Sequence, residues 1–114
     1  MALQRWFDRA DELGAAGKYF EAHEELEAAW KETSGDEKIV LQGLIQIAAG
    51  LHRLRLHPEK TDGGLYLLER GLEKLGRRRD LVTAESLAAL ERALLPVIAS
   101  GGAPEKMRFG LVAA

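Results

Sequence analysis

The hydrophobic positions of this chain recur at the three- and four-residue spacing of helices. No segment shows the period-two alternation that is typical of a strand. The spacing predicts helices over residues 2–15, 18–32, 36–56 and 63–76, and a fifth that begins after Thr83. We therefore expect an all-α, single-domain bundle of about five helices over 1–100, followed by an irregular tail over 101–114.

The links between these segments predict how the helices are arranged. Gly17 interrupts the pattern for only a few residues, so the first two helices should form an antiparallel hairpin. Ser34-x-x-Glu37 has the pattern of a capping box opening the third helix. The third helix, 36–56, is the longest and most apolar, and we expect it to be central, with Ile45 and Ala48 buried.

Two glycines interrupt the third helix at a spacing of two helical turns. Gly43 and Gly50 lie on one stripe, although a glycine inside a helix costs about 1 kcal/mol. Their presence predicts that a neighbouring backbone approaches closely there. Near the other end of the chain, Pro96 removes a helical hydrogen bond, which predicts a kink or an early end to the fifth helix. Met107, Phe109 and Leu111 would strap the tail to the core.

Composition supports the all-helical prediction. Leucine (19) and alanine (17) far outnumber valine (4), isoleucine (4) and threonine (3), and this bias favours helix over strand. Trp6, Phe7, Phe20 and Trp30 are expected in the core. The basic run Arg77–Arg79 is expected to be a solvated cluster that complements the end of the fourth helix.

Charge and cysteine usage limit the classes of partner. The net charge of −2 gives no electrostatic reason to expect a nucleic acid or a membrane surface as partner. The chain contains no cysteine, so disulfides and sulfur-ligated zinc are excluded. The N-terminus has no signal-peptide pattern, and no apolar run reaches the length of a membrane span. We expect a cytoplasmic protein, a monomer or small homo-oligomer, with an unknown ligand or protein as its partner.

The polar positions that stand out lie on the second and third helices. His23, Glu27 and Trp30 fall on one helical face, and His23 and Glu27 are one turn apart, within reach of each other. Gln42 and Gln46 lie on one side of the third helix. If that side crosses the His23–Glu27 face, the two amides would bond the remaining polar atoms.

These two segments also carry a family resemblance. The runs GKYFEAHEELEAAW over 17–30 and LQGLIQIA from Leu41, with Gly64 before a leucine-rich helix, resemble the family called domain of unknown function 309. The resemblance extends over about residues 5–75 and implies a small helical protein without an established activity. The positions that it marks are His23, Glu24, Glu27, Trp30, Gln42, Gly43, Gln46 and His52. Leu65 departs from the family pattern, where a small alanine is usual.

Three interpretations of this cluster remain open. The first is a buried polar network that fixes the register of the second and third helices. The second is a metal site with His23 and Glu27 as ligands, completed by His52 or Glu24 and by water. The third is metal-free acid–base chemistry by Glu27 with His23. His57 precedes Pro58 at a helix end and is expected to face water.

The predicted function is a binding or interaction module built around a semi-buried His/Glu/Gln cluster. Its expected binding residues are His23, Glu24, Glu27, Trp30, Gln42, Gln46 and His52. The alternative is a metal-dependent, hydrolase-like enzyme, with His23 and Glu27 as catalytic candidates and His23, Glu27 and His52 as metal ligands. An i,i+4 pair supplies only two of the three or four ligands that zinc takes, so no cofactor is predicted and the chain is expected to fold without metal.

Overall fold

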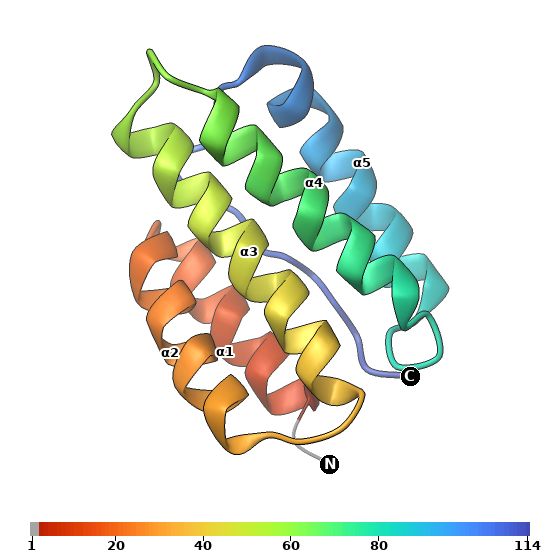
Figure 1. The fold of residues 1–114 in the computed structure, drawn as a ribbon. Helices are drawn as coiled ribbons and strands as arrows, with labels where there is room; N and C mark the ends of the chain where they lie inside the picture. Colours follow the sequence, from red (N-terminus) through yellow and green to blue (C-terminus); the bar gives the residue numbers. More distant parts are fainter. Residues whose placement is uncertain (1–2) are drawn as a thin grey trace.

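The computed structural model describes residues 3–114, which form five helices and no sheet (Figure 1). The helices are α1 (Leu3–Ala15), α2 (Tyr19–Glu32), α3 (Glu37–Leu56), α4 (Asp62–Arg77) and α5 (Ala84–Ser100). The predicted all-α bundle is therefore confirmed. Within residues 3–114, no helix is long and apolar enough to cross a membrane.

The first two helices form the predicted antiparallel hairpin (Figure 1). Gly17 has a φ of 75°, and the amide of Lys18 donates to the carbonyl of Leu13 while that of Gly17 donates to Gly14. This pair of bonds is a Schellman ending, which requires the left-handed conformation that glycine adopts without strain. The turn therefore fixes where α1 stops and α2 starts.

The central position predicted for α3 is also confirmed (Figure 1). Ile45 and Ala48 are buried, and α3 packs on α4 and on α2. The predicted capping box is wrong: α3 begins at Glu37 after Asp36, and no side chain caps it. Asp36 is already in the helical region at φ −69°, ψ −25°, so Ser34 stands too early in the chain to act as the cap.

Glycines bring α3 and α4 into backbone contact. A Cβ placed on Gly43 would lie 2.9 Å from the carbonyl oxygen of Gly71, and one on Gly50 would lie 2.8 Å from that of Gly64. The two pairs are spaced seven residues apart on each helix, so both fall on the same pair of facing stripes. The close approach expected from Gly43 and Gly50 is confirmed, and its partner is α4.

The start of α5 follows from a local cap. The Oγ1 of Thr83 accepts a hydrogen bond from the amide of Ser86, 3.3 Å away, which satisfies one of the free donors of the first turn. The early end predicted at Pro96 is wrong, because the helix continues through it to Ser100. Gly101, at φ 73°, then ends α5 in the left-handed conformation.

The tail after α5 runs back through the molecule between α1 and α5 (Figure 1). Phe109 and Leu111 are buried in the core, as expected, and Met107 is partly buried. The carboxylate of Asp11 in α1 accepts from the amides of Phe109 and Gly110, at 2.7 and 3.0 Å. On the α5 side, the amide of Thr83 donates to the carbonyl of Val112. The tail thus packs between α1 and α5 and is hydrogen-bonded to both.

One arginine of the basic run differs from the solvated cluster that was expected. Arg78 is only 26% exposed and forms ion pairs with Asp36, at 3.0 Å, and with Asp80, at 2.6 Å. Asp36 directly precedes α3, whereas Arg78 directly follows α4. The guanidinium therefore ties the end of one helix to the start of the other.

Replacement of Gly71 by alanine should destabilise the protein. The new Cβ would lie 2.6 Å from the carbonyl oxygen of Gly43, and backbone atoms in a helix pair cannot move apart freely. We expect Gly71→Ala to lower the free energy of unfolding by about 1–3 kcal/mol in urea titrations. Gly76→Ala in the same helix is the matched control, because its Cβ would meet no atom closer than 3.9 Å. It should be neutral or stabilise by up to about 1 kcal/mol. Equal effects of the two variants would contradict the backbone contact.

Loss of the Asp11 carboxylate should loosen the tail. Asp11→Ala leaves the amides of Phe109 and Gly110 without their acceptor, and we expect it to cost about 1–3 kcal/mol. Hydrogen exchange should quicken at these two amides before it quickens in α3. Glu12→Ala is the control, since Glu12 is 66% exposed and pairs only with Arg9. Unchanged exchange in the tail of Asp11→Ala would show that this bond does not hold it.

Candidate functional site

His23 and Glu27 form the predicted pair on α2. The Nε2 of His23 lies 3.2 Å from a carboxylate oxygen of Glu27. The His23 side chain is 27% exposed and that of Glu27 is 44% exposed, so solvent reaches both. The Nδ1 of His23 is buried and has no hydrogen-bond partner within residues 3–114. A half-exposed pair with an unused ring nitrogen differs from the sealed polar network that was one interpretation of the sequence.

Phe20 is exposed, contrary to the prediction that it belongs to the core. Its side chain starts on α2 one turn before His23, and the residue is 43% exposed. The ring centroid of Phe20 lies 6.0 Å from that of His23 and 5.1 Å from that of His52, which comes from α3. Phe20 is exposed because it lies at the edge of the α2–α3 contact rather than within it. Two imidazoles distant in sequence thus share one aromatic neighbour.

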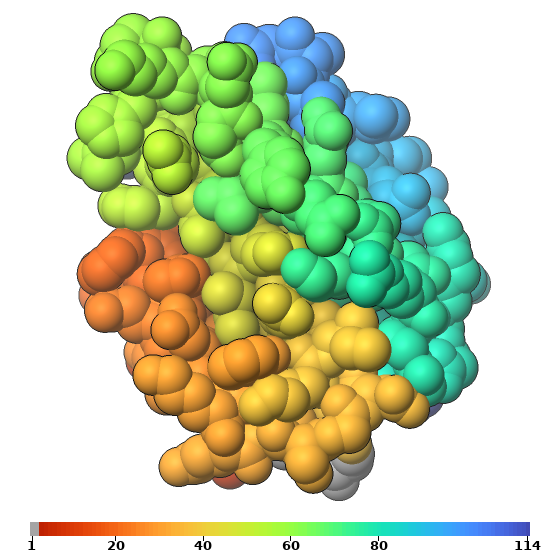
Figure 2. All heavy atoms as spheres, viewed as in Figure 1, coloured from red at the N-terminus to blue at the C-terminus, as the bar shows by residue number. Residues whose placement is uncertain are grey.

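These three rings border a cleft of about 290 Å³. Its lining comes from α2, α3, α4 and the residue that follows α3, and consists of Phe20, His23, Ala49, His52, Arg53, Leu56, His57 and Leu67. In Figure 2, atoms of α3 appear between those of α2 and α4. Four of these eight residues are apolar, and the other four carry an imidazole or a guanidinium group. The cleft can therefore bind an apolar group and offer it polar contacts at the edge.

Gln46 does not turn to the His23–Glu27 pair as expected. Its Oε1 accepts a hydrogen bond of 3.1 Å from the Nζ of Lys74, which is on α4. Lys74 is only 8% exposed, and burial lowers its pKa, as do the nearby guanidinium groups of Arg70 and Arg77. The reason for the difference is position: Gln46 lies between Gly43 and Gly50 along the stripe that faces α4. Gln42 is partly buried one turn earlier.

Trp30 and Glu24 lie outside the cleft. The ammonium of Lys38 is 3.9 Å from the centroid of the Trp30 ring, and it also donates to the Trp30 carbonyl at 2.9 Å. Trp30 therefore holds the connection between α2 and α3 through a cation–π contact. Glu24 is exposed and borders, with Glu27 and Lys31, another hollow of about 500 Å³ along α2, which His23 also lines.

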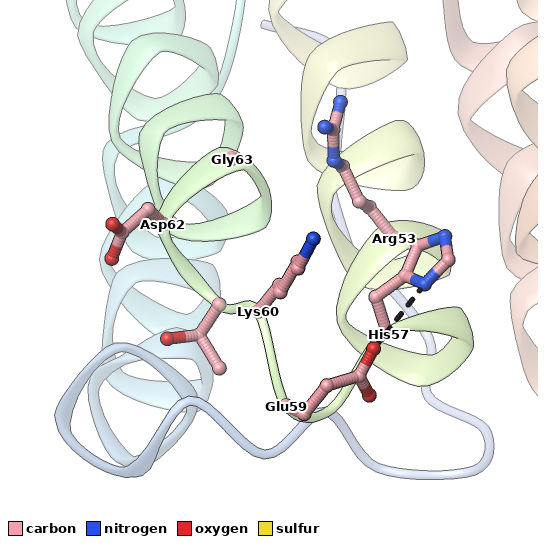
Figure 3. A pocket seen from close by; sticks show the side chains of 7 residues that line it. Arg53, His57, Glu59, Lys60, Asp62 and Gly63 are labelled. Carbon is pink, nitrogen blue, oxygen red and sulfur yellow. Dashed lines mark ion pairs between the residues drawn. The ribbon is translucent and has the colours of Figure 1, made fainter.

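A second hollow lies beside the cleft at the connection between α3 and α4 (Figure 3). It has a volume of about 760 Å³ and is lined by Arg53, His57, Glu59, Lys60, Thr61, Asp62 and Gly63. His57 is exposed to water, as predicted, and its Nδ1 lies 3.6 Å from the carboxylate of Glu59. Arg53 and His57 border both this hollow and the cleft. The two cavities therefore adjoin.

Several lining residues were not among the predicted site residues. Arg53, Leu56 and Leu67 carry no motif of their own, and Phe20 was assigned to the core. The one available signal was the concentration of basic side chains at the end of the third helix, where His52, Arg53 and His57 lie within six positions. Leu67 had no such signal, since its place depends on how closely α4 packs against α3.

The metal candidates do not meet at one point. Within residues 3–114, no group of three or more histidine, aspartate or glutamate side chains is placed to hold a metal ion. His23 and Glu27 form a pair, while His52 contacts the Phe20 ring. The described donors thus provide two ligands of the three or four that zinc takes.

Comparison with known proteins places the first half of the chain in a family. Searches of curated proteins and of solved structures find no match. A family model described as domain of unknown function (DUF309) matches residues 7–61. The matched segment is shorter than the resemblance over 5–75 and includes most of α1, all of α2 and α3, and the link to α4. The segment over residues 7–61, which holds His23, Glu27, Gln46 and His52, belongs to the DUF309 family.

Proposed function

We propose that this protein is a binding module whose recognition site is the cleft between α2, α3 and α4. The observation that carries the proposal is the exposed ring of Phe20, which lies close to both His23 and His52. An aromatic ring left 43% exposed beside Leu56, itself 60% exposed, forms an apolar surface that gains free energy when a ligand covers it. The lining combines apolar side chains with hydrogen-bonding and charged groups, a mixture typical of ligand sites.

The polar groups favour recognition over a structural role. His23 is oriented by Glu27, and its side chain is 27% exposed and lines the cleft. His52 is partly exposed, lines the same cleft and packs on Phe20. An imidazole can donate or accept a hydrogen bond, so this pair suits ligands of either kind.

The metal-dependent hydrolase remains the competing proposal at the same residues. It requires a third protein ligand next to His23 and Glu27 and an open position for water. Among residues 3–114 the third ligand is not in place, and His52 packs on Phe20 instead. The contacts therefore support binding more directly than hydrolysis.

Filling the cleft should abolish binding of an apolar probe. We expect N-phenyl-1-naphthylamine, a neutral fluorescent probe, to bind the wild-type protein with increased emission. Ala49 lines the cleft with a small, partly exposed side chain, so Ala49→Trp should weaken that binding at least ~10-fold by occupying the space.

Ala93→Trp is the matched control, because Ala93 is exposed on α5 and does not line the cleft. It should bind the probe like the wild type, and both variants should keep their helical circular dichroism. Equal binding by all three proteins would overturn the proposed site, as would a wild type that does not bind the probe.

Replacement of Glu27 should test whether the pair holds the fold together. Because Glu27 is 44% exposed, Glu27→Ala should change the free energy of unfolding by less than about 1 kcal/mol. Leu26→Ala gives the contrast, since Leu26 is buried and its loss should cost about 2–5 kcal/mol. Urea titration measures both. A cost of 2 kcal/mol or more in Glu27→Ala would instead support a structural network.

A further inference from the structure

We infer that the ligand of the cleft is an amphipathic organic anion, with its apolar body in the cleft and its acidic head at Arg53. This inference rests on the proposed binding function and adds the chemistry of the ligand. It follows from the two adjoining cavities, one mostly apolar and one polar, which share Arg53 and His57 as their border.

Arg53 is a cation without a counter-ion. Within residues 3–114 its guanidinium has no ion-pair or hydrogen-bond partner, whereas those of Arg9, Arg70 and Arg78 are paired with carboxylates. It packs on the first turn of α4, where a Cβ on Gly63 would lie 2.8 Å from its Nε. Glycine at this position therefore leaves room for the guanidinium. A planar, permanently charged fork held in this way suits two oxygens of a carboxylate, sulfonate or phosphate.

The groups around Arg53 favour an anion in the second hollow. The ammonium of Lys60 points into the space between α3 and α4, towards the side on which Arg53 lies (Figure 3). Asp62 points away from that space, and Glu59 is directed to His57. A guanidinium and an ammonium thus face the hollow, and one of its two carboxylates is engaged by an imidazole. An anionic head would gain from both cations at once.

The cleft sets the other half of the ligand. Phe20, Leu56 and Leu67 provide apolar contacts, and Ala49 leaves depth beneath them. A volume of about 290 Å³ is near the lower end of the range for drug-sized ligands, so one or two rings or a short alkyl chain would fill it. The same region is too small to enclose a folded partner, whose interface would extend over a much larger area.

A pair of fluorescent probes separates the charge from the apolar body. 1-Anilinonaphthalene-8-sulfonate carries a sulfonate, whereas N-phenyl-1-naphthylamine has the same rings without it. Arg53→Gln should weaken the binding of the sulfonate at least ~10-fold, because a charge-assisted contact is lost. It should leave the binding of the neutral probe within about twofold of the wild type.

Arg55→Gln is the matched control, since Arg55 is exposed on the same helix and lines neither cavity. It removes the same net charge and should leave the binding of both probes unchanged. Equal weakening of sulfonate binding by the two variants would overturn the inference, because it would show a general charge effect. Sulfonate binding that is unaffected by Arg53→Gln would also overturn it. In either case, binding of the neutral probe to the wild-type protein decides whether the proposed function also fails. If the wild type binds this probe and Ala49→Trp does not, the proposed function stands without the anion. If the wild type does not bind it, the proposed function fails as well.

Discussion

The backbone contact between α3 and α4 is the constraint on which the rest of this structure depends. Gly43 faces Gly71, and Gly50 faces Gly64. As the residue number rises along α3 it falls along α4, so the helices are antiparallel, and both pairs belong to the same register. Side chains at these positions would push the helices apart by the width of a methyl group or more. The register therefore depends on backbone shape, whereas most helix pairs interlock through larger side chains.

This contact also determines where the candidate site can form. Because α4 approaches so closely, Leu67 lines the cleft together with residues of α3. For the same reason the buried side chain of Lys74 donates a hydrogen bond to Gln46. On the other side of α3, Phe20 and His52 meet at the edge of the contact with α2. The cleft is lined by residues of all three helices. Ala49 is among them, and its small side chain occupies little of that space.

The C-terminal tail solves a separate packing problem. In the described chain α1 and α5 do not pack on each other, and the tail fills the gap between them. Its backbone amides find side-chain acceptors on both neighbours, Asp11 and Gln4 on α1 and Ser86 on α5. An extended segment can be buried only if its amides are satisfied in this way. Phe109 and Leu111 then contribute to the core that a sixth helix would otherwise supply.

The sequence by itself determined the features that depend on near neighbours along the chain. Helical spacing set the five helices within a residue or two, Gly17 set the hairpin turn, and the i,i+4 spacing set the His23–Glu27 pair. The fifth helix begins after Thr83, as expected. The capping box predicted from Ser34 does not form, because Asp36 already has helical backbone angles. Pro96 did not end its helix, because α5 continues through it to Ser100.

Only the tertiary structure decided which distant residues meet. Gly43 and Gly50 indicated a close neighbour, but no local pattern named α4 as that neighbour. The direction of Gln46, the exposure of Phe20 and the approach of His52 depend on how three helices are rotated about their axes. Such rotations are fixed by the sum of many side-chain contacts across the core, whereas a helix is fixed by hydrogen bonds four residues apart. For that reason the helices and the His23–Glu27 pair were predictable from the sequence, and the cleft was not.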